Sequence, residues 1–261
     1  PLRLVGSEMC IRDRFWDGSQ TTGNGSIEGG SGTWTSGATN WTGVNGSFNA
    51  AWAPNSFAVF QGAAGTVSVD GAQAITGLQF VTDGYNVVGG TAGALTLFNG
   101  TGGNTAVRVD PNATATLGVT LNGGGTLAKL DAGTLVLNGA NTYTGGTALN
   151  GGTLVVGNNS ALGSGALTAS NGTTLDSNAA VSLANDVNVN GTLTVGGSNA
   201  LTLAGSVAGT GSLIKNGIAS LTLSGNNTYA GPTALNAGGL ILASNTALGT
   251  GALNAAAGTT L

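Results

Sequence analysis

A long internal repeat limits the folds that this chain can adopt. Residues 125–175 return without a gap as residues 211–261, a period of 86 residues, and 28 of the 51 aligned positions are identical. About half of the changes exchange one apolar residue for another, Ser for Thr, or Gly for Ala. Short Val, Leu and Thr runs separated by Gly and Asn, repeated over such a distance, predict stacked coils that cannot bury their apolar faces singly.

The repeated segments have the pattern of half-buried β-strands. Runs such as TLVL, TLVV, VNVNGTLTV and SLTL alternate apolar and small polar residues with a period of two. Asn-Gly steps such as those at Asn122, Asn138 and Asn150 supply the positive φ angles of tight corners. Hairpins use the same turns, so an antiparallel sandwich is the alternative. Recurrence favours a parallel β-helix, because stacked coils benefit from repetition and the strands of a sandwich each have their own environment. We predict an all-β parallel solenoid.

A parallel β-helix buries the apolar positions of its strands in a central bore. We expect Thr and Ser between these positions to face water. The first copy of the repeat contributes Leu135, Leu137, Leu154, Val156, Leu167 and Leu175, and the second contributes Leu221, Leu223, Leu240, Leu242, Leu253 and Leu261.

Composition excludes much of ordinary enzyme chemistry. The chain has no His, a single Cys at Cys10, and 6% charged residues, so Ser-His-Asp triads, Cys-His pairs and His-based metal sites are ruled out. Nucleic-acid binding needs clustered Lys and Arg, whereas only Arg108, Lys129 and Lys215 follow residue 14. We therefore predict no catalytic, cofactor-binding or metal residues, no cofactor and no nucleic-acid partner. The sequence leaves the ligand-binding residues unknown.

Only carboxylates remain for acid-base work. A glycoside-cleaving β-helix needs two of them about 5–9.5 Å apart on one outer face. No close pair occurs in the sequence, and several acids adjoin Gly, Asn or Pro, as turn formers do. The structural interpretation is therefore favoured for each. The acids are Asp17, Glu28, Asp70, Asp83, Asp110, Asp131, Asp176 and Asp186.

Three further sets of residues invite a functional interpretation. Tyr143 and Tyr229 share a repeat position, where corner packing is favoured over an aromatic platform for glycans. Lys129 and Lys215 also share a position, and we expect both to be solvated. Four tryptophans form either a contact surface or a cap on the N-terminal end of the bore. They are Trp16, Trp34, Trp41 and Trp52.

The chain divides into three regions. Residues 1–14 contain half of the Lys and Arg residues together with the only Cys and Met. They resemble translated sequencing-adapter DNA, and we expect them to be non-native; a native charged lead segment is the alternative. Residues 15–110 contain most of the aromatic residues and are predicted to form an N-terminal β-helix or cap region. Residues 111–261 are predicted to form the repeat-bearing β-helix, truncated at its C-terminus.

Both copies of the repeat resemble the autotransporter-associated β-strand repeat of Gram-negative surface proteins. The first copy contains GTLVLNGANTYTGGTALNGGTLVVGNNSALGSGAL, with its two Gly-Thr-Leu strands and its Ala-Leu-Gly turn. The second copy departs from this pattern at Asn226, Ala230, Pro232 and Gly239, in turns or at a strand start.

This resemblance implies a right-handed parallel β-helix passenger, carried across the outer membrane with a C-terminal β-barrel and displayed at the cell surface or secreted. It implies a non-catalytic stalk or scaffold, or an adhesin, whose repeats support passenger folding and transport. Its partners would be its own barrel and host or matrix glycans or proteins. We expect a signal peptide upstream of residue 15 and the barrel beyond residue 261.

Two alternatives remain open. One is a secreted polysaccharide-active β-helix enzyme, which needs two converging acids. The other is a flat-faced binding solenoid such as an ice binder, which needs regular Thr-x-Thr ladders once per coil. The Thr spacing in the sequence is irregular.

Overall fold

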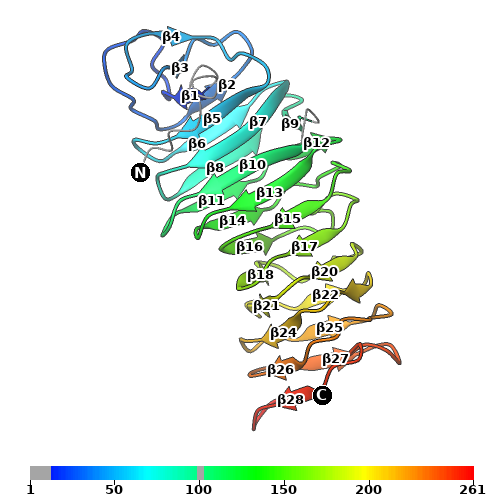
Figure 1. Cartoon of the computed structure of the whole chain (residues 1–261). Helices are drawn as coiled ribbons and strands as arrows, with labels where there is room; N and C mark the ends of the chain where they lie inside the picture. The colour runs from blue at the N-terminus through cyan, green and yellow to red at the C-terminus, as the bar shows by residue number, and fades with distance from the viewer. Residues whose placement is uncertain (1–12, 99–102) are drawn as a thin grey trace.

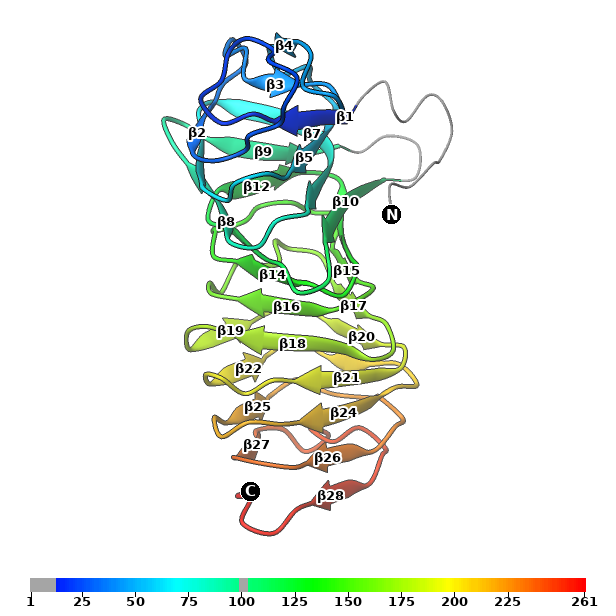
Figure 2. The ribbon, with the colours of Figure 1, turned by 90° about the vertical axis from the view of Figure 1, so that its left-hand side faces the viewer.

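Short alternating strands with Gly and Asn corners form coils that stack along one axis (Figure 1; Figure 2). The computed structural model describes residues 13–98 and 103–261, and every regular element in these ranges is a β-strand. The all-β solenoid predicted from the repeat is confirmed. No helix of the described residues is long and apolar enough to cross a membrane.

The strands form three sheets, which lie along the sides of the stack. The first sheet has 13 strands: β1 (Asp13–Trp16), β3 (Trp41–Thr42), β4 (Asn49–Ala50), β5 (Ser56–Phe60), β7 (Ala72–Phe80), β9 (Ala94–Leu97), β10 (Asn104–Val109), β12 (Thr120–Gly123), β13 (Thr126–Leu130), β15 (Thr147–Leu149), β17 (Leu167–Ala169), β20 (Val187–Val189) and β23 (Val207–Ala208). The second has 11: β2 (Gly32–Trp34), β6 (Thr66–Val69), β8 (Tyr85–Gly89), β11 (Thr114–Leu117), β14 (Thr134–Leu137), β16 (Thr153–Val156), β18 (Thr173–Ser177), β21 (Thr192–Val195), β24 (Ser212–Lys215), β26 (Thr233–Leu235) and β28 (Leu253–Ala255). The third has four: β19 (Val181–Leu183), β22 (Leu201–Leu203), β25 (Leu221–Leu223) and β27 (Leu240–Leu242).

Pairing between successive coils is parallel, as a β-helix requires. The exceptions among the paired strands of the described residues are β1 with β3 and β3 with β4, which are antiparallel. Each coil of the repeat region advances the chain by about 20 residues, since Leu127 pairs with Thr147 and Thr147 with Leu167. The antiparallel sandwich considered from the sequence is therefore wrong.

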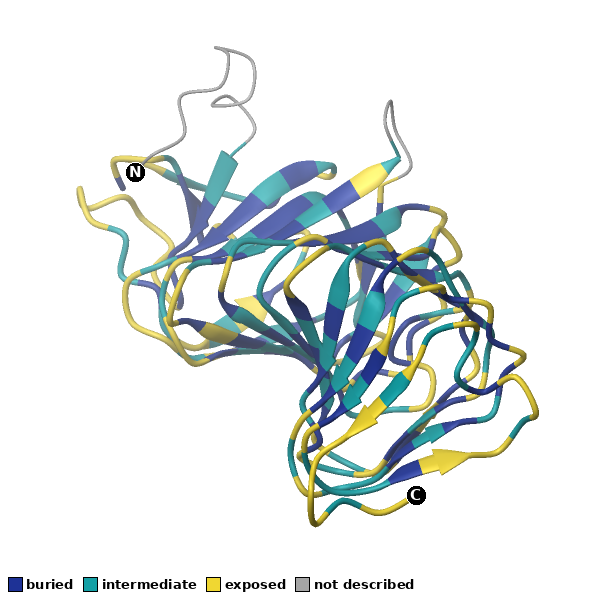
Figure 3. Ribbon diagram, turned by 60° about the horizontal axis from the view of Figure 1, so that its bottom comes forward, coloured by how far each residue is buried: buried dark blue, intermediate teal, exposed yellow. Residues whose placement is uncertain are grey.

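The predicted bore is present, although its last coil is open. All six bore positions predicted from the first copy are fully buried, as are Leu221, Leu223 and Leu240. Leu242 and Leu261 instead expose 41% and 68% of their surface, and Leu253 is only partly buried. The physical reason is that β27 and β28 each have a strand on one side only. Figure 3 shows the buried interior and the more exposed outer side of the coils.

The 86-residue period does not equal a whole number of coils. Four parallel steps of 20 residues lead from Leu127 to Val207 within the first sheet. The next six residues carry the chain to Leu213, which lies in the second sheet. Consequently β13 and β14 occupy the first and second sheets, whereas their counterparts β24 and β25 occupy the second and third. Equivalent residues of the two copies therefore lie on different sides of the solenoid.

The N-terminal segment of residues 1–14 can be placed only in part. Asp13 and Arg14 begin β1, which pairs with β5, and the other twelve residues of the segment 1–14 lie outside the described residues. The division near residue 110 stays a prediction, and so does the handedness of the helix.

Candidate functional site

The acidic residues of the described chain do not gather in groups of three. Within residues 13–98 and 103–261, no group of three His, Cys, Asp or Glu side chains is placed to hold a metal ion. Four aspartates instead accept backbone N–H groups from the next coil, which is how Asp stabilises a turn. These contacts are Asp70 to Thr91, Asp83 to Thr114, Asp176 to Ser198, and Asp186 to Ser206.

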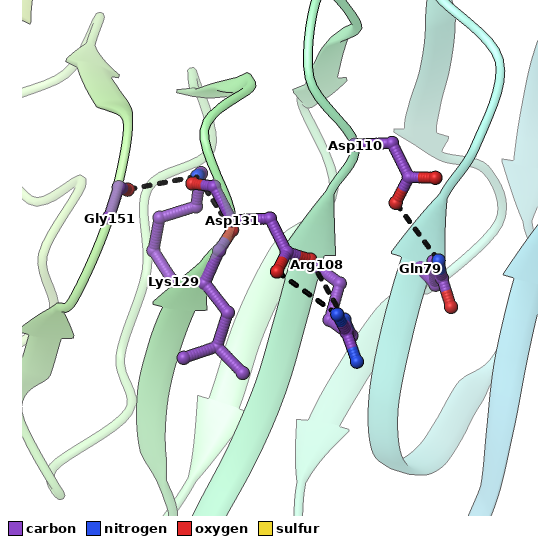
Figure 4. A network of polar contacts seen from close by, with 7 residues as sticks. Gln79, Arg108, Asp110, Lys129, Asp131 and Gly151 are labelled. Atoms are coloured by element: carbon purple, nitrogen blue, oxygen red, sulfur yellow. Dashed lines mark hydrogen bonds and ion pairs between the residues drawn. The ribbon is translucent and has the colours of Figure 1, made fainter. Parts of the chain in front are cut away.

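Two more acids lie in a polar network on the first sheet (Figure 4). Asp131 accepts two hydrogen bonds from Arg108, at 2.8 Å from Nε and 3.0 Å from Nη2. This contact raises the pKa of Arg108, and burial opposes the shift. Asp110 accepts a 2.9 Å bond from the amide of Gln79. Both carboxylates accept hydrogen bonds from side chains of their own sheet. The network therefore stabilises the pairing of neighbouring strands and does not have the arrangement of an acid-base pair.

Lys129 is buried beneath this network, and the predicted solvation of this lysine is wrong. Its side chain has no exposed surface. Nζ donates to the carbonyl oxygens of Leu130, Asp131 and Gly151, at 2.8, 2.9 and 3.1 Å. The third contact joins its corner to the next coil. Burial lowers the pKa of Lys129 to about 8, and the Asp131 carboxylate opposes this shift.

Lys215 repeats this arrangement on a different side of the solenoid, so its predicted solvation is also wrong. It is fully buried, and Nζ donates to the carbonyls of Asn216, Gly217 and Ala237 at 2.7, 2.8 and 3.3 Å. Burial lowers the pKa of Lys215, and Asp176 opposes the shift. We call the two groups the lysine clamps. Their role is to satisfy carbonyls that converge at a corner.

The sequence contained a signal for these clamps. Leu127 and Lys129 are two residues apart in one strand, and such residues point to the same face. Leu127 is a buried core residue, so Lys129 also points inward. Leu213 and Lys215 have the same relation. The alternation that identified the bore thus already placed both lysines inside it.

Tyr143 and Tyr229 are corner-packing residues, and the exposed aromatic platform is wrong. Both are fully buried. Each hydroxyl shares a 2.6 Å hydrogen bond with a threonine four residues later, Thr147 or Thr233. Burial raises the pKa of both tyrosines, which keeps the hydroxyls protonated as hydrogen-bonding groups.

We expect Tyr143→Phe to lower the free energy of unfolding by about 1–2 kcal/mol, because the buried Thr147 hydroxyl loses its partner. Urea unfolding followed by circular dichroism measures the change. The matched control is Tyr143→Phe with Thr147→Val, which removes both polar groups and should recover part of the loss. A double variant less stable than the single one would contradict this assignment.

The four tryptophans form a cap, and their interpretation as a contact surface is wrong. Trp16, Trp34, Trp41 and Trp52 are buried. Trp41 lies 4.7 Å from both Trp34 and Trp52, and 5.1 Å from Trp16, between ring centroids. We call this group the tryptophan cluster. It closes the N-terminal end of the bore beneath the antiparallel strands β3 and β4.

One ordered feature does lie on the outer surface. A single column of threonines crosses five strands of the second sheet, and none of its members is buried. Parallel pairing aligns them, and they follow one another at intervals of 20, 19, 21 and 20 residues in the sequence. The column consists of Thr114, Thr134, Thr153, Thr174 and Thr194. The adjacent outward column is mixed, with Thr116, Val136, Val155 and Asp176, so a regular Thr-x-Thr array is absent from these strands.

Comparisons with known proteins agree with this architecture. The passenger-associated-transport-repeat family matches residues 127–156 and 213–242, which are offset by the same 86 residues as the sequence repeat. We call these two matched segments the passenger repeats. The resemblance found in the sequence is thus confirmed. Each passenger repeat contains one lysine clamp and one buried tyrosine.

A relative supports the same assignment. The Adhesin BmaC autotransporter of Brucella suis biovar 1 (strain 1330) is 43% identical over 169 residues. The match covers 58% of this chain and 5% of the relative, so the chain spans a small part of that protein's length. No solved structure matches the chain.

Proposed function

We propose that this chain is part of a non-catalytic autotransporter passenger, displayed at the surface of a Gram-negative bacterium or secreted from it. Its passenger repeats form a β-helical stalk and support folding and transport across the outer membrane. The partner for export is the whole protein's own outer-membrane β-barrel. The observation that carries this proposal is the continuous parallel solenoid in which both matched passenger repeats lie.

An adhesive role extends this proposal. Support comes from the name of the relative, which is an adhesin, and from a long outer surface with few charges. The contacts would be to host or matrix glycans or proteins. Binding of the purified chain to immobilised matrix glycans and proteins tests this role, and absence of binding above that of a heat-unfolded sample would contradict it.

The two alternatives receive less support. A polysaccharide-cleaving enzyme needs two free, converging acids, and the aspartates discussed above are occupied by donors within the coils. A flat-faced binder is favoured by the threonine column, but its mixed neighbouring column gives no two-dimensional lattice of hydroxyl groups.

Export is the property to test first. The chain is fused between a signal peptide and an unrelated autotransporter barrel, and display is measured by external protease on intact cells. Leu154→Asp puts a charge into the bore, whereas Thr153→Asp, the matched control, places it on the outer face. We expect display of the parent and the control and a loss of folded display for Leu154→Asp. Retention of the parent inside the cell would contradict the proposal.

A further inference from the structure

The most unusual polar group of the described chain is an aspartate inside the N-terminal cap. Asp17 has no exposed surface. Its Oδ1 accepts a 2.9 Å bond from the backbone N–H of Glu28, and its Oδ2 accepts a 2.8 Å bond from Asn49. The one salt bridge among residues 13–98 and 103–261 is that of Arg108 with Asp131, so neither Asp17 nor Glu28 has a basic partner there. A buried carboxylate without a counter-charge is costly.

Strand pairing directs further oxygen atoms toward this carboxylate. Trp16 pairs with Trp41 in the antiparallel β1–β3 ladder, so Asp17 lies opposite Asn40, and the backbone N–H of Asp17 donates to the Asn40 carbonyl at 3.1 Å. Residues that lie opposite each other in such a ladder point their side chains to the same face of the sheet. This is the face opposite the tryptophans.

The adjoining strand adds a second amide to that face. Thr42 pairs with Phe15 on one side and with Asn49 on the other, so Asn49 lies in the row of Phe15, two rows from Asp17 and on the same face. The hydrogen bond from Asn49 to Asp17 fixes its position. Glu28 lies against the same carboxylate through its backbone N–H. Asp17 thus has Asn40, Asn49 and Glu28 as neighbours, and the side chain of Glu28 accepts a 2.6 Å bond from Asn24 through its Oε1.

Three side-chain oxygen atoms of these neighbours of Asp17 have no hydrogen-bond partner although they are buried. These atoms are Oε2 of Glu28, Oδ1 of Asn40 and Oδ1 of Asn49. Asn40 is only 5% exposed, and its amide nitrogen is already used by the carbonyls of Gly18 and Thr33. Buried acceptors without donors call for an ion or a water molecule.

We propose that Asp17, Glu28, Asn40 and Asn49 form a calcium site that stabilises the N-terminal cap. Two carboxylates and two amide oxygens are the ligand types that Ca²⁺ takes, with water completing its shell. The ligands come from β4, from the residues that adjoin β1 and β3, and from a loop. This irregular set suits the flexible coordination of Ca²⁺ better than the strict octahedron of Mg²⁺. The cation would offset both acidic charges and fasten the Glu28 loop to the β1–β3–β4 sheet.

The tryptophan cluster provides a direct readout of this site. Trp16 precedes Asp17, and Trp41 follows Asn40, so cation binding changes the surroundings of the indole rings. The chain is first treated with a chelator, and calcium chloride is then added up to about 10 mM, beyond the range of extracellular calcium modules. We expect a saturable change in tryptophan fluorescence and a rise of the cap's Tm by about 5–10 °C at concentrations far above Kd. Magnesium chloride at the same concentrations should produce a much smaller rise.

Three variants make the test specific. Glu28→Gln removes one charge from a half-buried side chain and should weaken calcium binding by about tenfold or more, since ligand charge sets affinity in such sites. Asn49→Asp adds a carboxylate, and should destabilise the chelator-treated cap and increase its response to calcium. Asp186→Asn is the matched control, because Asp186 is exposed and bonds only Ser206, and its calcium response should equal that of the parent.

Two results would overturn the calcium site. One is the absence of a saturable response in the parent chain. The other is an equal response in the parent and in Glu28→Gln, which would assign the three unpaired oxygens to buried water. Neither result bears on export, so the calcium site and the passenger function are tested separately.

Discussion

Replacing Trp41 by alanine is expected to lower the stability of the N-terminal cap by about 3–5 kcal/mol. The indole ring is fully buried, and the rings of Trp34 and Trp52 both lie 4.7 Å from it. Its removal deletes this apolar area and leaves a cavity that the neighbouring rings cannot fill without moving. Fluorescence of the other three tryptophans reports the cap alone, because all four tryptophans of the chain lie there.

The solenoid should respond to this change unevenly. Coils of a repeat protein interact with their nearest neighbours, so a defect at one end lowers local stability first. We expect the Trp41→Ala cap to unfold at lower urea than the repeat region, whose strands are followed by circular dichroism. The control is Phe48→Ala, in the same hairpin with 53% of its surface exposed, which should change stability by less than about 0.5 kcal/mol. Equal effects of the two substitutions would show that the tryptophan cluster is not the core of the cap.

Replacing Lys129 by methionine is expected to cost about 2–4 kcal/mol, because three buried carbonyl oxygens lose a charged donor. Methionine retains most of the length and apolar volume of the lysine stem, so the loss reports the ammonium group and not a cavity. Urea unfolding of the repeat region measures it. Arg108→Met is the matched control from the neighbouring strand. Arg108 forms a partly exposed ion pair, and we expect a loss below about 1 kcal/mol there.

The lowered pKa of Lys129 should make the free energy of unfolding depend on pH. Its pKa is about 8 in the folded chain and about 10.4 when unfolded. Between these values the unfolded chain binds more protons, so stability should rise with pH. Tyrosine ionisation acts in the opposite direction near pH 10, because burial raises the pKa of Tyr85 to about 12. Measurements from pH 8 to about 9.5 avoid it.

Lys129→Met should reduce this slope, and Lys215→Met should reduce it as well, since burial lowers the pKa of both lysines. A slope that is unchanged in both variants would show that the lysine clamps remain protonated throughout this range.

The sequence by itself determined the class of the fold and most of its bore. Alternation of period two placed Leu135, Leu137 and Leu154 inside, because successive side chains of a strand point to opposite faces. The repeat favoured a parallel solenoid over a sandwich, and its motif resembles the autotransporter-associated repeat. The same alternation places Lys129 and Lys215 on the inward face of their strands. Their charge argues for solvation, but the position in the strand decides, so the prediction of solvated lysines was wrong.

Only the tertiary structure decided where the two copies lie relative to each other. A sequence period of 86 residues does not give the number of residues in one coil. That number depends on the length of the corners, and the pairing of strands between coils determines it. The period of 86 residues spans four coils and also the step from one sheet of the solenoid to the next. Lys129 and Lys215 therefore lie on different sheets. The aligned threonine column and the convergence on Asp17 likewise depend on contacts between residues far apart in the chain. No local pattern contains such contacts, because they arise from the register in which separate strands pair.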